Sequence, residues 1–267
     1  MANPLSAYRV YASTLSSIEK LPFAVLEKEI HIVLAFARDY DGGGKYQTGT
    51  FYPYFDTSKL TPQAIQNIRD KATSTSVKFF LSIGGRNPKF PFAVTSAAET
   101  AWIQAATKSL REIIQNYQID GIDVYYEHIN PDAEHQFASS IQKVIGSLKR
   151  GHTITTASIT VPAPLSQNYH DLYKINNAVF DYVVYQSHTE TSPICTFEAL
   201  GGVFDRLVST YGYPKNKILA GHSDVLPGDW TTVPLPIFLG AVPQLLGKGL
   251  FGISKWIVTP EDYKPEA

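Results

Sequence analysis

A short acidic segment, 120–127, contains the residue types and spacing that could do chemistry. It reads Asp-Gly-Ile-Asp-Val-Tyr-Tyr-Glu, so Asp123 and Glu127 stand four residues apart with Tyr125 between them. Side chains two apart on a β-strand point to the same face, so these three form one row, with Asp120 just before the strand. Carboxylates in such a row can hold and transfer the proton that splits a glycosidic bond. In this chain the middle position carries a phenol instead.

The tyrosine in the middle of the row is expected to interrupt proton exchange between the two ends. A general acid must be protonated near the working pH, and neighbouring carboxylates that share its proton tune that acidity. Asp123 and Glu127 are roughly 13 Å apart on a strand that advances about 6.7 Å every two residues. A phenol has a pKa of about 10, so Tyr125 supplies no negative charge at neutral pH. Losing one charge that acts in the transition state typically costs ~10² to 10³ in rate.

The elements that must position this row follow from the hydrophobic pattern. Short apolar, β-branched runs alternate with longer amphipathic stretches, as in a buried parallel sheet with helical crossovers. Apolar residues recur at spacings of three and four over 98–117, which predicts a helix, and two more helices are predicted over 132–149 and 196–211. The predicted strands cover 8–13, 31–37, 77–83, 121–125, 153–161, 180–186, 217–222 and 250–256.

Eight parallel strands with helical connections predict an α/β fold, a closed (β/α)8 TIM barrel, whose chemistry lies at the carboxyl ends of the strands. We find no internal repeat, linker or low-complexity segment that would divide the chain. Residues 1–267 are therefore expected to form a single domain.

Composition excludes several classes of function. Lys plus Arg is 23 and Asp plus Glu is 24, a net charge of -1, which argues against a nucleic-acid partner or an anionic membrane surface. No apolar stretch approaches the ~20 residues of a membrane span. Cys195 is the single cysteine, so no intrachain disulfide can form, and no His-x-x-x-His spacing suggests a metal site. We expect a monomer without metal or cofactor.

The first residues of the chain lack the pattern of a signal peptide, which begins with basic residues and continues with an apolar run. The expected location is therefore the cytoplasm or a storage compartment. If a signal has been trimmed and a methionine supplied, the expected location is outside the cell instead.

Four segments, in order, carry a resemblance to a known family. Segment 79–85 contains Ser-x-Gly-Gly, and 120–127, followed by His128, resembles Asp-Gly-Ile-Asp-x-Asp-Tyr-Glu-His. Segment 180–186 resembles a sixth barrel strand, and 252–256 resembles a last strand that ends in tryptophan. Together they resemble glycoside hydrolase family 18, in particular the bulb-type class III chitinases of plants and their seed-storage relative narbonin.

The resemblance implies a reaction and assigns roles by position. Family members cleave β-1,4 links between N-acetylglucosamine units, with the acetamido group of the substrate as nucleophile, so the implied ligand is a chito-oligosaccharide. Glu127 occupies the position of the acid, and Tyr125 replaces the aspartate that orients the acetamido group. A second acetamido contact, a tyrosine in the family's Gln-Phe-Tyr, is His188 here, two residues after Gln186.

The remaining residues of the implied site have two interpretations each. Ser82, Gly84 and Gly85 at a strand end either pack the barrel or let a sugar approach closely. Trp256 is either core or the surface against which a sugar ring stacks. Together with Gln186 and His188, these residues make six expected binding positions. The acidic residues Asp120 and Asp123 are expected to be partly structural.

These departures predict a chitinase-like protein that has lost hydrolysis and retains Glu127 as a vestigial acid. Its role would be narbonin-like storage or weak, lectin-like binding of N-acetylglucosamine oligomers. The alternative is a slow endochitinase in which Tyr125 or His188 has taken over part of the lost role.

Overall fold

Eight parallel strands close into a barrel at the centre of the molecule. The computed structural model describes residues 5–19, 21, 29–40, 47–72, 76–223 and 233–256. Around the barrel the strand order is β1-β2-β4-β5-β6-β7-β8-β9, and β9 pairs with β1 to close it. The strands are β1 Ala7–Ala12, β2 Glu29–Tyr40, β4 Ser76–Gly85, β5 Gly121–Tyr126, β6 Thr156–Pro162, β7 Tyr182–Gln186, β8 Ile218–Ser223 and β9 Gly252–Trp256. The predicted TIM barrel is confirmed.

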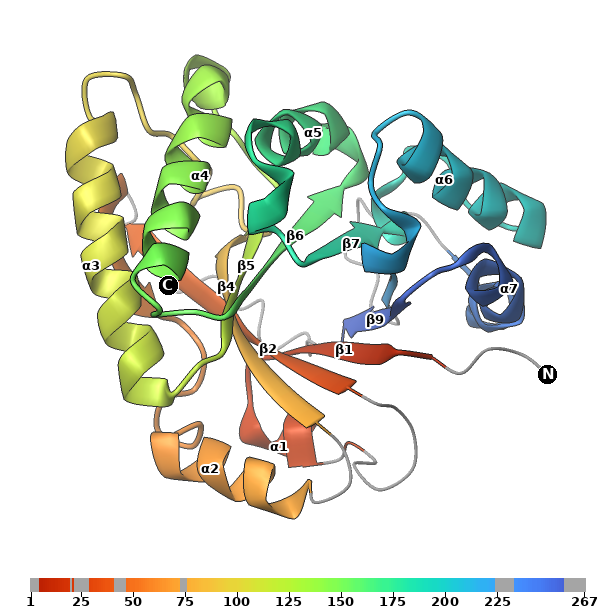
Figure 1. The fold of residues 1–267 in the computed structure, drawn as a ribbon, viewed down its shortest axis with the longest axis horizontal. Helices are drawn as coiled ribbons and strands as arrows, with labels where there is room; N and C mark the ends of the chain where they lie inside the picture. The colour runs from red at the N-terminus through yellow and green to blue at the C-terminus, as the bar shows by residue number, and fades with distance from the viewer. Residues whose placement is uncertain are drawn as a thin grey trace.

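Helices wrap the outside of the barrel, as Figure 1 shows for α3 to α7. They are α1 Leu15–Glu19, α2 Pro62–Lys71, α3 Glu99–Tyr117, α4 Glu134–Arg150, α5 Ser166–Ile175, α6 Phe197–Ser209 and α7 Leu235–Lys248. Short 3-10 turns cover Pro131–Ala133, Ala163–Leu165, Asn177–Val179, Ser187–Thr189 and Lys215–Lys217. Within the described ranges, no helix combines the length and apolar content needed to span a membrane.

Local signals explain where several helices begin and end. Thr61 caps α2, because its hydroxyl accepts a hydrogen bond from the amide of Ala64 at 3.2 Å. Thr196 caps α6 in the same way. The predicted helix over 98–117 is confirmed as α3, which ends where Gln118 adopts a left-handed conformation with φ of 52°.

Two hydrophobic cores lie on opposite sides of the strands. The larger core fills the space between barrel and helices. A smaller one fills the barrel interior, with Tyr11, Phe80, Tyr125, Val184 and Trp256 among its members. Strand residues alternate between the two, so Tyr125 faces inward while its neighbours on β5 face the helices.

The hairpin strand β3 Gln47–Pro53 was not predicted. It runs antiparallel to β2 and extends the sheet beyond the barrel, with a register irregularity between Arg38 and Tyr40. The predicted strand 153–161 also begins later, at Thr156, since the chain turns through Gly151 and His152 after α4.

Candidate functional site

Asp123 lies at the centre of the barrel and is fully buried. Parallel pairing brings Ser82 of β4 and Ser158 of β6 level with it. Its Oδ1 accepts hydrogen bonds from Ser158 Oγ at 2.6 Å and Thr160 Oγ1 at 2.8 Å. Its Oδ2 accepts from Ser82 Oγ and the Tyr11 hydroxyl, both at 2.9 Å. The predicted binding residue Ser82 therefore contacts this carboxylate.

Tyr125 occupies the next inward position of β5 and packs among aromatic rings. Its ring centroid is 5.5 Å from Trp256, 5.8 Å from Phe36 and 6.5 Å from Tyr11. Tyr11 also stacks on Trp256, with centroids 4.6 Å apart. We call Tyr11, Phe36, Tyr125 and Trp256 the aromatic cluster. All four are at least nine-tenths buried, so the space beside Asp123 is filled by rings.

Glu127 directly follows β5 and contacts a cation. Its Oε2 is 3.5 Å from Nε of Arg86, which follows β4, and the side chains are only 10% and 19% exposed. A neighbouring guanidinium favours the ionised form of a carboxylic acid. The residue at the position of the acid is therefore held in an ion pair at the barrel mouth.

His188 lies in the short turn Ser187–Thr189 after β7 and is buried. Burial lowers the pKa of its imidazole to about 3, and the nearby charges of His222 and Arg86 lower it in the same direction. The ring is therefore neutral at physiological pH. The influence of Arg86 on both Glu127 and His188 places these three residues together at the barrel mouth.

Gln186 ends β7 two residues beyond the inward-facing Val184. Its side chain is 2% exposed, and within the described part of the chain its Oε1 accepts no hydrogen bond. A buried acceptor without a partner is costly, so this oxygen is suited to a donor such as water or a ligand hydroxyl.

Gly84 and Gly85 shape the end of β4. Their φ values are +95° and +116°, and a Cβ on Gly84 would lie 2.4 Å from the carbonyl oxygen of Tyr125. A Cβ on Gly85 would lie 3.2 Å from the Phe36 ring. Both glycines therefore let β5 and the aromatic cluster approach β4 closely.

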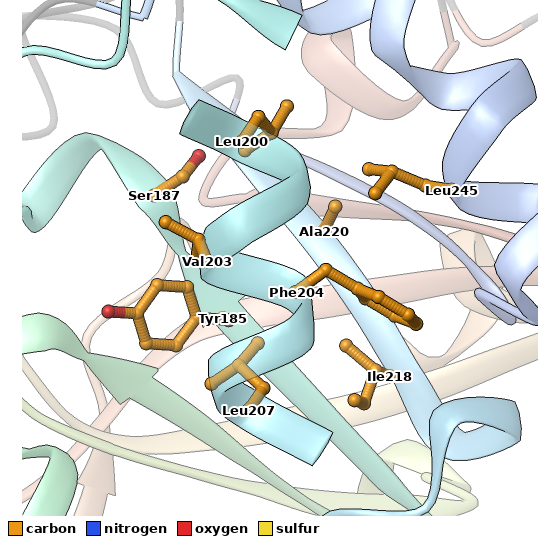
Figure 2. Close-up of a pocket in the computed structure, with 9 residues that line it drawn as sticks. All are labelled: Tyr185, Ser187, Leu200, Val203, Phe204, Leu207, Ile218, Ala220 and Leu245. Atoms are coloured by element: carbon orange, nitrogen blue, oxygen red, sulfur yellow. The ribbon is translucent and has the colours of Figure 1, made fainter. Parts of the chain in front are cut away.

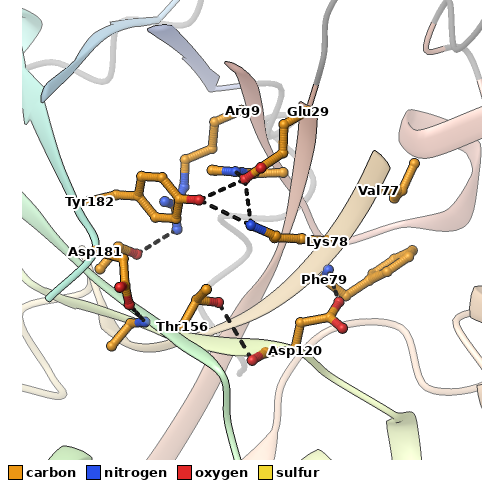
Figure 3. Close-up of polar contacts among 12 residues, drawn as sticks. Arg9, Glu29, Val77, Lys78, Phe79, Asp120, Thr156, Asp181 and Tyr182 are labelled. Atoms are coloured by element: carbon orange, nitrogen blue, oxygen red, sulfur yellow. Dashed lines mark hydrogen bonds and ion pairs between the residues drawn. The ribbon is translucent and has the colours of Figure 1, made fainter. Parts of the chain in front are cut away.

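Asp120 lies at the opposite end of the barrel from Glu127, so the structure does not bring these carboxylates together. It accepts a hydrogen bond from the Phe79 amide at 2.7 Å and pairs with Arg69 at 2.8 Å. Figure 3 shows Asp120 among the contacts of this amino-terminal end, near Lys78. Contacts at this end of such barrels serve stability.

The same end of the barrel carries a compact polar network (Figure 3). Glu29 accepts hydrogen bonds from Lys78 at 2.8 Å and from the Tyr182 hydroxyl at 2.7 Å, and it also contacts His31. Despite its partial burial, these donors lower the pKa of Glu29 to about 2. Burial lowers the pKa of His31 in this network to about 4, and the nearby charge of Arg9 acts in the same direction.

A small apolar cavity lies outside the barrel, between β7, β8 and the helices α6 and α7 (Figure 2). Its volume is about 10 Å³, room for about one water molecule. Leu200, Phe204, Ile218, Ala220 and Leu245 are among the side chains that line it. It is too small and too apolar to take a sugar ring.

Sequence reasoning missed several contributors to the site: the hydroxyls of Tyr11, Ser158 and Thr160 around Asp123, and the side chains of Arg9, Arg86 and Phe36. Arg9 interrupts an apolar strand at an inward position, and a charge there is a signal that could have been noticed. Arg86 and Phe36 gave no such signal, since their contacts depend on how neighbouring strands end.

Comparison with known proteins gives matches over most of the chain. The sequence profile of Glycosyl hydrolases family 18 matches residues 7–206. The RuBisCO-associated protein of Glycine max is 35% identical over 226 residues, which cover 82% of this chain and 78% of that protein. Chitinase 1 of Tulipa saxatilis subsp. bakeri is 34% identical over 168 residues, 59% of this chain and 51% of that protein.

Solved structures give the same picture. The family 18 chitinase of Crocus vernus superposes with a TM-score of 0.82 at 25% identity, covering 94% of this chain and 92% of that one. The catalytic domain of a family 18 chitinase from the fern Peteris ryukyuensis gives 0.81 at 29% identity, covering 94% and 91%. The similarity therefore extends over nearly the whole barrel.

Proposed function

Because the chain belongs to glycosyl hydrolase family 18, we propose that it is a chitinase-like protein that does not hydrolyse chitin. The observation that carries this proposal is the buried position of Tyr125 within the aromatic cluster. Where a catalytic member needs a carboxylate, this barrel has a neutral ring held by Phe36 and Trp256. A phenol cannot supply the negative charge that a positively charged intermediate requires at neutral pH.

Two further features support the same proposal. Glu127 lies 3.5 Å from the guanidinium of Arg86, so the residue at the position of the acid is one half of an ion pair. His188, at the second acetamido position, is a neutral and buried imidazole. The soybean relative is also named for association with RuBisCO, not for hydrolysis. A non-catalytic role, such as narbonin-like storage, is consistent with these features.

The test is hydrolysis of N-acetylglucosamine oligomers by the purified protein between pH 4 and 7.5. We expect no product, and Glu127→Gln should be indistinguishable from the unmodified chain. Steady turnover that Glu127→Gln abolishes would overturn the proposal in favour of a slow endochitinase.

A second experiment asks what else separates this barrel from an enzyme. Tyr125→Asp combined with His188→Tyr restores both acetamido-binding groups of the family pattern. Hydrolysis by this double variant, against none by either single variant, would indicate that these two changes account for the loss. A folded double variant that shows no hydrolysis would indicate that other residues also contribute to the loss of activity.

Weak, lectin-like binding of N-acetylglucosamine oligomers is a second candidate function. Gln186 favours it, because its buried Oε1 accepts no hydrogen bond among the described residues. Isothermal titration calorimetry with chitotetraose at millimolar concentration should show heat that Gln186→Leu removes. A flat titration would leave storage as the better proposal.

A further inference from the structure

β1 places an arginine inside the barrel. Ala7, Arg9 and Tyr11 alternate with outward-facing residues, and Arg9 is completely buried. Its Nη2 lies 3.1 Å from Oδ1 of Asp123 and donates a hydrogen bond to Ser158 Oγ at 2.7 Å. Its guanidinium lies 4.4 Å from the centroid of the Phe80 ring. Arg9 therefore sits directly against a carboxylate of the candidate site.

Four hydroxyls and one guanidinium surround the carboxyl group of Asp123. A carboxylate has about four lone-pair positions, and the hydroxyls of Ser82, Ser158, Thr160 and Tyr11 all lie within 2.9 Å of its oxygens, while Tyr11 and Thr160 also contact each other at 2.5 Å. Two carboxylates can share one proton only if each offers a free oxygen lone pair to the other. In this barrel the oxygens of Asp123 are already engaged by hydroxyls and by Arg9.

We propose that Arg9 is a positioning residue that engages Asp123 in a buried ion pair and prevents it from sharing a proton with an acid at position 125. This inference rests on the proposed function, because it explains why a carboxylate row would fail here even if Tyr125 were replaced. This barrel therefore carries a phenol at one inward position and a guanidinium at another.

Other charges near Asp123 do not change this assignment. Among the described residues, Arg9 and Tyr11 from β1 and Tyr169 from α5 are ionisable groups that interact with it. Burial raises the pKa of both tyrosines well above the ordinary value, so both remain neutral. Of these three groups, Arg9 alone carries a charge at neutral pH. The hydroxyls of Ser82, Ser158 and Thr160 complete the surroundings without adding charge.

The first test follows carboxyl protons directly. Three variants are labelled with ¹³C at their aspartate carboxyls: Tyr125→Asp alone, Tyr125→Asp with Arg9→Met, and Tyr125→Asp with the charge-conserving Arg9→Lys. The chemical shift of the carboxyl at position 125 is then followed by NMR as the pH is changed. Removing the nearby cation should raise the pH at which the introduced carboxyl loses its proton by at least one unit, a tenfold change in acidity. Arg9→Lys should leave it within half a unit of Tyr125→Asp alone. If the carboxyl at position 125 loses its proton at the same pH with and without Arg9→Met, the proposal is overturned.

A second test needs no acid at position 125. Unfolding equilibrium constants are measured for Arg9→Met, Asp123→Asn and the double variant. Breaking a buried pair at either end should raise the constant by roughly 10²- to 10³-fold. The unfolding constant of the double variant should rise at least tenfold less than the product of the two single increases, because neither charge is then left unpaired. Simple multiplication of the single effects would mean that Arg9 acts only by packing.

Neither test measures product, so the two proposals can fail separately. Hydrolysis by the unmodified protein would overturn the proposed function and leave the role of Arg9 to these measurements. If the unfolding effects of the single variants simply multiply, and the carboxyl at position 125 titrates equally with and without Arg9, the role of Arg9 is overturned. The proposed function would still stand.

Discussion

His188 should make this barrel sensitive to acid. Its imidazole is buried at the barrel mouth, where its pKa falls to about 3 from an ordinary value of 6.5. The folded chain therefore resists protonation at a site that the unfolded chain protonates readily. The stabilisation is present in full above pH 6.5 and is lost as the pH falls towards 3.

The size of the effect follows from the same two values. Each pH unit between them corresponds to about 1.4 kcal/mol in the free energy of unfolding. The full interval is therefore ~5 kcal/mol, and at pH 4.5 the loss is about 3 kcal/mol. Domains are stable by about 5–15 kcal/mol, so one residue removes a large part of the margin.

The assay compares the wild type with His188→Gln and His188→Phe by urea denaturation at pH 7, 6, 5 and 4. The substitutions shift stability by a constant amount through packing, but they remove the titrating group. Relative to the wild type, both variants should gain about 1.4 kcal/mol for each pH unit below 6. Variant and wild-type profiles that stay parallel from pH 7 to pH 4 would refute the reasoning.

Three further expectations concern stability. Burial raises the pKa of Asp39 to about 6, so its contribution to the free energy of unfolding is present below about pH 3.8 and lost as the pH rises through 6. Relative to the wild type, Asp39→Asn should gain ~3 kcal/mol in the free energy of unfolding between pH 4 and pH 7 in the same denaturation assay. A difference that stays constant with pH would contradict this. Gly84→Ala should cost at least about 3 kcal/mol in the free energy of unfolding, because the added Cβ meets the Tyr125 carbonyl. The control Gly212→Ala is also at positive φ but in open space, so it should cost only about 1 kcal/mol. Similar melting temperatures for the two variants would count against this account. Tyr125→Ala should cost ~3 to 5 kcal/mol by emptying the aromatic cluster, against less than about 0.5 kcal/mol for exposed Tyr52→Ala, and equal denaturation midpoints would be the contrary result.

The sequence was sufficient to predict the barrel, since its strands repeat an apolar pattern and α3 has a clear helical spacing. It was also sufficient to place Asp123 and Tyr125 on one face, because strand alternation is a local property. Local spacing does not determine which side chains cross the barrel. Arg9 reaches Asp123 from 114 residues away, and Trp256 meets Tyr125 from the last strand.

The hairpin β3 shows the same limit in the fold itself. Its residues lack a strong strand pattern, and the strand is specified by its partners, since Asp39 of β2 accepts hydrogen bonds from Gln47 of β3 and from Trp102 of α3. The position of Arg86 beside Glu127 likewise depends on β4 and β5 ending at the same level.

The contact between Arg9 and Asp123 also joins β1 to β5, two strands that are not neighbours in the sheet. Hydroxyls from β1, β4 and β6 meet at the same carboxylate. These groups can satisfy one another only after the sheet has curved into a closed cylinder. A partly assembled sheet would therefore expose an unpaired charge, which should make closure a late, cooperative and slow step in folding, as expected where contacts span long sequence separations.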